Sequence, residues 1–153
     1  MDEEYQLVII GGGVEIEKYK ALINQYRLNN VYLIEFLPKE KVYVYYLAAN
    51  LFVLPTREDI WGLVINEAMA CALPVVSSDR CIAALEMVGD NGAIVPLDDP
   101  QSMGTAMKEI LENDRLRNTM EESSLKTISE YTIERIWESH IRAIEEALNG
   151  VKE

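Results

Sequence analysis

Positive charge is scarce in this sequence, which has 14 lysine and arginine residues against 26 aspartate and glutamate residues. The formal net charge is therefore −12 at pH 7. Binding along nucleic-acid phosphates or on an anionic membrane needs clustered basic residues, so the composition disfavours both as broad partners. The excess acid is typical of solvated helix faces in the C-terminal third of the chain.

Cysteine, histidine and long apolar runs are scarce as well. The two cysteines, Cys71 and Cys81, lack the spacing of metal ligands, and we expect buried free thiols in a reducing compartment. The only histidine, His140, falls in the last helical pattern, where we expect it on the surface. No apolar run is long enough to span a membrane, and the acidic start at residues 1–6 is not typical of a signal peptide. These absences predict a cytoplasmic protein, or at most a membrane-peripheral one.

The sequence does contain a regular alternation of short apolar runs and helical patterns. The runs predicted as strands are Tyr5–Ile10, Val31–Glu35, Asn50–Leu54, Pro74–Ser78 and Gly92–Pro96. Helical patterns separate these runs, and three more helices are expected over about residues 100–148. The alternation predicts an α/β fold, in which a Rossmann-like parallel sheet carries helices on both faces. Because no repeat or linker interrupts it, we expect residues 1–153 to form a single domain.

In parallel sheets of this kind, ligands bind beyond the carboxyl ends of the strands. Three loops are expected at that edge: Gly11–Gly13, Phe36–Lys39 and Thr56–Gly62. The first loop only half fits a dinucleotide fingerprint, because Ile16 stands where the third glycine belongs. The sequence therefore favours a tight turn there over an NAD site.

In the segment REDIWGLVINEAMA, Arg57–Ala70, the carboxylates of Glu58 and Asp59 come shortly before a predicted helix start near Trp61 or Gly62. The N-terminus of a helix attracts anions, and a glycine lets a phosphate approach the backbone. Asp59 and Glu67 are too far apart to share a metal or a proton, but they could hold the two ends of an elongated polar ligand such as a nucleoside diphosphate sugar. Two simpler interpretations stay open: Asp59 is only a helix N-cap, and Glu67 is only a solvent-facing helix residue.

The longer segment REDIWGLVINEAMACALPVVSSD, Arg57–Asp79, resembles the signature of the family-four (group 1) nucleotide-sugar glycosyltransferases. That signature is an acidic residue, seven residues, and then a glutamate. The likeness extends in order and spacing from Leu7 to His140. It implies the C-terminal, donor-binding half of a retaining enzyme with the GT-B fold. Such an enzyme transfers a hexose-type sugar from a nucleoside diphosphate sugar to a glycan, lipid or similar acceptor.

The resemblance also implies the roles of individual residues. Asp59 matches the acid that contacts the transferred sugar, and Glu67 matches the acid that holds the ribose. The remaining matches line the donor site: Trp61, Gly62, Leu63 and Val64 at the helix start, and Leu37 and Pro38 in the loop beside the base. Enzymes of this family use no bound metal, so the resemblance implies neither a metal nor another cofactor.

Departures from the family pattern limit what the chain is expected to do alone. The first acid is Asp59 where glutamate is usual, and Ala72 stands where glycine is common. The first strand of the family's donor-binding domain and the whole N-terminal acceptor-binding domain have no counterpart here. We therefore expect a fragment that is inactive in isolation and that self-associates through an exposed sheet edge or through the uncovered face of the domain.

Two other classes of function remain as alternatives. The same fold could serve as a non-catalytic module that binds nucleotides or sugar phosphates. A structural interaction domain is a further alternative, with Tyr43, Tyr45 and Tyr46 as its contact face. We expect these tyrosines instead to form the core and rim of a helix.

Overall fold

The computed structural model describes residues 5–150, and the chain forms two compact units that meet in sequence between Leu47 and Ala48. The acidic start of the chain covers residues 1–6, and residues 1–4 of it lie outside the described residues. Within the described part, no helix is both long and apolar enough to cross a membrane.

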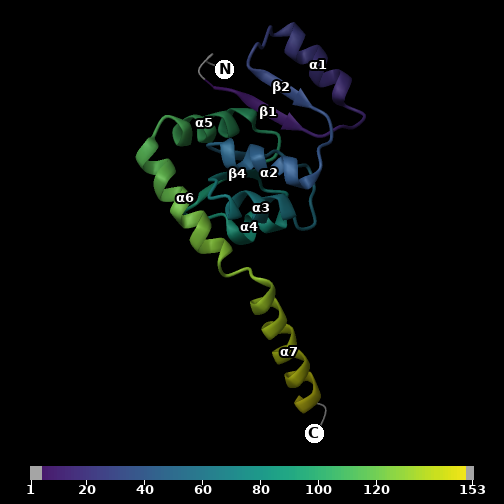
Figure 1. Cartoon of the computed structure of the whole chain (residues 1–153), viewed down its shortest axis with the longest axis vertical. Helices are drawn as coiled ribbons and strands as arrows, with labels where there is room; N and C mark the ends of the chain where they lie inside the picture. Colours follow the sequence, from purple (N-terminus) through teal and green to yellow (C-terminus); the bar gives the residue numbers. More distant parts are fainter. Residues whose placement is uncertain (1–4, 151–153) are drawn as a thin grey trace. The chain divides into compact units, whose positions relative to one another are not determined.

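The first unit alternates two strands with two helices (Figure 1). These elements are β1 (Leu7–Ile10), α1 (Ile16–Gln25), β2 (Val31–Ile34) and α2 (Lys39–Ala48). The strands pair in parallel, with Val8 opposite Tyr32. All four elements fall where the apolar patterns predict them. The tyrosines of α2 divide as expected between core and rim, since Tyr46 is buried, Tyr43 is half-buried and Tyr45 is exposed.

Helix α1 differs from its prediction in how its apolar face is covered. The helical spacing of the sequence predicts one apolar face made of Ile16, Tyr19, Leu22, Ile23 and Tyr26. The first and fourth of these residues are half-buried, the other three are exposed, and α1 has no buried residue. Over residues 5–47, the sheet of this unit has two strands. Two strands offer too little surface to cover a helix of ten residues, so the first unit has a small core.

The described part of the second unit contains three strands and five helices. These elements are β3 (Phe52–Leu54), α3 (Leu63–Ala70), β4 (Val75–Ser78), α4 (Ile82–Met87), β5 (Gly92–Val95), α5 (Pro100–Leu111), α6 (Asp114–Ile128) and α7 (Ile133–Gly150). The strands form a parallel sheet in the order β3-β4-β5. The predicted α/β architecture, with parallel strands and helices on both faces, is confirmed.

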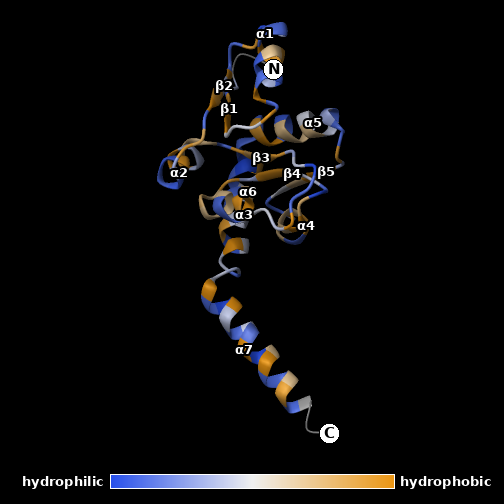
Figure 2. Ribbon diagram, turned by 90° about the vertical axis from the view of Figure 1, so that its right-hand side faces the viewer, coloured by the Kyte–Doolittle hydropathy of each residue, from blue (hydrophilic) through white to orange (hydrophobic). Residues whose placement is uncertain are grey.

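The sheet of the second unit lies between two layers of helices. Figure 2 shows α5 on one face of the sheet and α3 with α4 on the other, while α6 packs against both α3 and α5. The central strand β4 is buried along its whole length, and its two buried serine hydroxyls, of Ser77 and Ser78, donate to the backbone carbonyl oxygens of Leu54 and Thr56. Gly92 of β5 packs so tightly that an added Cβ atom would lie 1.9 Å from the carbonyl oxygen of Val75. This core holds the carboxyl ends of the three strands in fixed positions.

Candidate functional site

The turn between β3 and α3 contains most of the predicted site residues, and the loop after β4 holds it in place. Asp59 forms a parallel bridge with Cys81, although 22 residues separate them in sequence. The backbone N–H of Asp59 donates to the carbonyl oxygen of Arg80 at 3.1 Å, and the N–H of Ala83 donates to that of Trp61 at 2.9 Å. The carboxyl ends of neighbouring strands thus build one connected surface.

The carboxylate of Asp59 is not the N-cap of α3. Its Oδ1 atom accepts a hydrogen bond from the backbone N–H of Trp61 at 3.2 Å, which closes an Asx turn. Helix α3 begins at Leu63, and its N-cap residue is Gly62. Asp59 therefore lies in the turn before the helix, so helix geometry does not set the distance between the carboxylates of Asp59 and Glu67. The Asx turn fixes Asp59 close to the start of α3.

Gly62 is required at the N-cap position for two reasons. Its φ angle of 85° lies in the left-handed region, which favours glycine. A Cβ atom at this position would also lie 2.5 Å from the Sγ atom of Cys81, which is too close for any side chain. Because glycine carries no side chain, nothing on residue 62 covers the first backbone N–H groups of α3.

The other residues at the helix start differ in exposure. The half-buried side chain of Trp61 donates its ring N–H to Oδ1 of Asn66 at 3.1 Å. Val64 is half-buried, whereas Leu63 is 69% exposed. The Trp61–Asn66 hydrogen bond orients the indole ring, and the exposed Leu63 leaves an apolar contact surface beside the turn.

Glu67 is the fifth residue of α3 and is half-buried. The neighbouring residues Ile65, Ala68 and Met69 are fully buried, as the sequence predicts for this helix. Burial raises the pKa of the Cys71 thiol, and the negative charge of Glu67 raises it further. Cys71 is half-buried and Cys81 is buried, and both are free thiols.

Leu37 and Pro38 belong to the first unit, immediately before α2. Leu37 is half-buried and Pro38 is exposed. The carbonyl oxygen of Pro38 accepts the backbone N–H groups of Lys41 and Val42, so Pro38 lies at the start of α2 as predicted. The other predicted site residues all lie in the second unit: Asp59, Trp61, Gly62, Leu63, Val64 and Glu67.

Two side-chain interactions connect the loop after β3 to its neighbours, and sequence reasoning predicted neither contact. The Arg57 guanidinium donates to both carboxylate oxygens of Asp98, at 2.7 and 3.3 Å. The Ser78 hydroxyl donates to the carbonyl oxygen of Thr56. Each pair is more than 20 residues apart, and the only sequence signal is that all four residues follow or end parallel strands.

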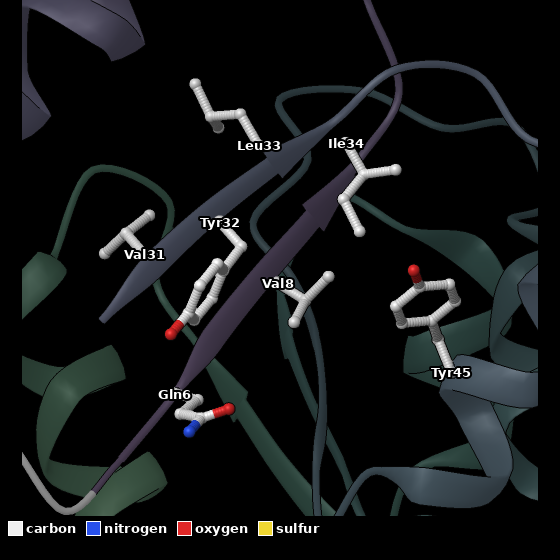
Figure 3. Close-up of a pocket in the computed structure, with 7 residues that line it drawn as sticks. All are labelled: Gln6, Val8, Val31, Tyr32, Leu33, Ile34 and Tyr45. Atoms are coloured by element: carbon white, nitrogen blue, oxygen red, sulfur yellow. The ribbon is translucent and has the colours of Figure 1, made fainter. Parts of the chain in front are cut away.

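The described surface has two hollows, one in each unit. One, of about 420 Å³, lies at the carboxyl ends of β3, β4 and β5, and its lining includes Arg57, Ser78 and Asp98. The other, of about 510 Å³, lies in the first unit on the exposed face of its two strands (Figure 3). Val8, Tyr32 and Tyr45 line it, and none of the predicted site residues does.

The geometry of the turn is suited to binding an anion next to hydroxyl groups. The N-terminus of α3 carries partial positive charge, and the carboxylates of Asp59 and Glu67 lie before it and about one turn inside it. Carboxylates accept hydrogen bonds from hydroxyl groups. Over residues 5–150, no group of three or more histidine, cysteine, aspartate or glutamate residues is arranged to hold a metal ion.

Residues 1–127 match a family model described as glycosyl transferases group 1. Over 117 residues, the chain is 32% identical to the N-acetylgalactosamine-N,N'-diacetylbacillosaminyl-diphospho-undecaprenol 4-alpha-N-acetylgalactosaminyltransferase of Campylobacter jejuni, a match that covers 74% of this chain and 32% of the relative. It is 30% identical over 109 residues to the O-antigen chain mannosyltransferase B of Escherichia coli, covering 71% of this chain and 28% of the relative. The chain spans about a third of the length of the curated relatives it matches.

Solved structures share the fold. Sucrose-phosphate synthase from Thermosynechococcus elongatus superposes with a TM-score of 0.81 at 26% identity, covering 95% of this chain and 39% of that one. A variant of S. aureus TarM, in complex with Fondaparinux, alpha-GlcNAc-glycerol and UDP, superposes with a TM-score of 0.84 at 22% identity, covering 92% and 29%. These structural neighbours are glycosyltransferases of the GT-B fold.

Proposed function

This chain belongs to the group 1 glycosyltransferases, and we propose that it is the donor-binding half of an enzyme that uses a nucleoside diphosphate sugar. The enzyme transfers the sugar to a glycan, lipid or similar acceptor with retention of configuration. The observation that carries the proposal is the start of α3, where Gly62, three residues after Asp59, occupies the N-cap position without a capping side chain. The part of the relatives' length that this chain does not span would supply the acceptor site, so the chain alone is inactive.

The diphosphate of the donor binds at the N-terminus of α3. Backbone N–H groups and the positive end of the helix dipole stabilise phosphate oxygens there. No side chain at Gly62 obstructs the approach, and a departing diphosphate is stabilised by the same groups. This binding mode needs no metal ion.

The two carboxylates hold the hydroxyl groups on either side of the diphosphate. Asp59 keeps its hydrogen bond from the Trp61 N–H and retains further acceptor positions for hydroxyl groups of the transferred sugar. Glu67, about one turn inside α3, accepts the two ribose hydroxyls. Trp61, Leu63 and Val64, at the start of the same helix, border the donor.

The names of related proteins support this choice of substrate. The Campylobacter and Escherichia relatives are named for the transfer of N-acetylgalactosamine and mannose. One structural neighbour was solved with UDP-glucose and others with UDP. A nucleoside diphosphate sugar is therefore the donor class that fits this chain best.

Calorimetric titration with UDP, GDP and ADP tests the proposal, with turnover measured in the whole protein that carries this chain. We expect one diphosphate to bind, and Glu67→Gln to weaken it by about 1.5–3 kcal/mol, roughly ten- to a hundredfold. Asp59→Asn should leave diphosphate affinity nearly unchanged and reduce turnover, because its contacts strengthen as the sugar gains positive charge.

Glu122→Gln is the matched control, because Glu122 is an exposed residue of α6 away from the turn. It should change neither affinity nor turnover. Failure of all three diphosphates to bind the unmodified protein would refute the proposal. Equal losses of diphosphate affinity in the Asp59 and Glu67 variants would instead limit Asp59 to shaping the turn.

A further inference from the structure

The thiol of Cys81 lies beneath the turn that carries the candidate site. Its Sγ atom donates to the carbonyl oxygen of Trp61 at 3.3 Å, and the residue is fully buried. Cys81 also occupies the N-cap position of α4, but its side chain makes no capping hydrogen bond to that helix. The thiol therefore bonds to the turn before α3 and not to the helix that it precedes.

The same sulfur atom fills the space that a side chain at residue 62 would need. A Cβ atom on Gly62 would lie 2.5 Å from Sγ of Cys81, well inside van der Waals contact. Sulfur and glycine thus pack directly against each other, one from the loop after β4 and the other from the start of α3. The size of residue 81 fixes how closely these two segments approach.

We propose that Cys81 is a positioning residue that sets the location of the first N–H groups of α3. The proposal rests on the proposed function, in which those N–H groups bind the diphosphate of the donor. Cys81 does not touch the donor, and it acts only through Gly62 and Trp61. It acts together with the Asp59–Cys81 bridge and the Ala83–Trp61 hydrogen bond, which hold the remainder of the turn.

Two variants remove the S–H group of Cys81 and change the size of residue 81 in opposite directions. Cys81→Ala removes the hydrogen-bond donor and leaves a small space beneath Gly62. Cys81→Val adds a branched side chain where the structure has no room, and so it displaces the turn. Cys71→Val is the matched control, because it makes the same chemical change at the half-buried C-cap of α3.

Titration of each variant with the diphosphate that binds the unmodified protein, among UDP, GDP and ADP, provides the first measurement. We expect Cys81→Val to weaken binding about tenfold or more, since displacement of binding groups by about 1 Å has effects of this size. Cys81→Ala should have a smaller effect in the same direction, and Cys71→Val should bind as the unmodified protein does. A folded Cys81→Val variant with unchanged affinity overturns the inference.

Alkylation of the unmodified protein with iodoacetamide is the second measurement, and it decides the question if Cys81→Val does not fold. The bound diphosphate should slow the modification of Cys81 severalfold, because the turn must open to expose the thiol, and should affect Cys71 much less. Equal slowing at both cysteines overturns the inference. If the unmodified protein binds none of the three diphosphates, the proposed function fails and this inference fails with it. If the unmodified protein binds one of the diphosphates but the results for Cys81 differ from those expected, this inference fails and the proposed function does not.

Discussion

Two backbone positions on either side of α3 take left-handed dihedral angles, and only one of them is a glycine. Gly62 precedes the helix with φ of 85°, and Ala72 follows it with φ of 61°. The N–H of Ala72 donates to the carbonyl of Met69, and that of Leu73 donates to Ala68, which is the Schellman pattern of helix termination. This geometry favours glycine at residue 72, where the chain has alanine.

Ala72→Gly should therefore stabilise the protein. A left-handed conformation costs an L-residue about 1–2 kcal/mol, while glycine adds less than 1 kcal/mol of unfolded-state entropy. We expect the free energy of unfolding to rise by about 1 kcal/mol in urea denaturation. The control is Ala70→Gly, at an exposed position within α3, where the same change should lower stability by about 1 kcal/mol. Lower stability in both variants would contradict the strain at Ala72.

A site residue could be predicted from the sequence only where the residues next to it in the chain indicate its role. Asp59, Gly62 and Glu67 belong to one continuous motif whose spacing along the chain is visible. Cys81 and Asp98 contact that motif from loops after other strands, and no local pattern identifies such contacts. Spacing alone also left Asp59 open as a helix N-cap, because the start of α3 could be located only to within one or two residues.

At the scale of elements, apolar periodicity predicted every strand and helix of the described chain. Boundaries differ by one or two residues, as for β1, which begins at Leu7 where the apolar run begins at Tyr5. The packing partners of these elements were less predictable. Helix α1 has the pattern of a helix that covers a sheet, yet no residue of α1 is buried. Periodicity shows which face is apolar, but not how much surface is available to cover it.

Helix α5 begins with a capping interaction that should make the stability of this helix depend on pH. The Asp99 carboxylate accepts hydrogen bonds from the Ser102 hydroxyl at 2.6 Å and from the Ser102 N–H at 3.0 Å. Both hydrogen bonds lower the pKa of Asp99 below its usual value of 3.8, and the bond from the hydroxyl has the larger effect. A lowered pKa adds stability above the unfolded-state pKa, and this stability is lost as the pH falls through the folded-state pKa.

Asp99→Ala should consequently lower the thermal midpoint at pH 7 and have a much smaller effect at pH 2. Circular dichroism melting at the two pH values measures the difference. Asp90→Ala provides the control, since Asp90 is an exposed residue between α4 and β5. An equal loss from Asp99→Ala at both pH values would show that the cap does not depend on ionisation.

At the scale of the whole molecule, the fold class and family were predictable, but the division into two units was not. Alternating strands and helices predicted one domain, and that prediction remains open. Over residues 5–150, the strands pair as β1-β2 within the first unit and as β3-β4-β5 within the second. Strand pairing depends on contacts that apolar patterns do not encode, which is why the pairing within each unit could not be predicted from the sequence.

Native-state hydrogen exchange should show that the two units differ in stability. Strand β4 is buried throughout, whereas β1 and β2 contain no buried residue. A two-stranded sheet with a small core opens readily, because few apolar contacts are lost when it does. We expect amide protection factors in β4 to exceed those in β1 and β2 by at least about a hundredfold, an energy difference of roughly 2.7 kcal/mol. The paired strand β5 is the internal control and should exchange nearly as slowly as β4. Similar protection factors in all strands would show that the chain unfolds as one cooperative domain, as the sequence alone predicts.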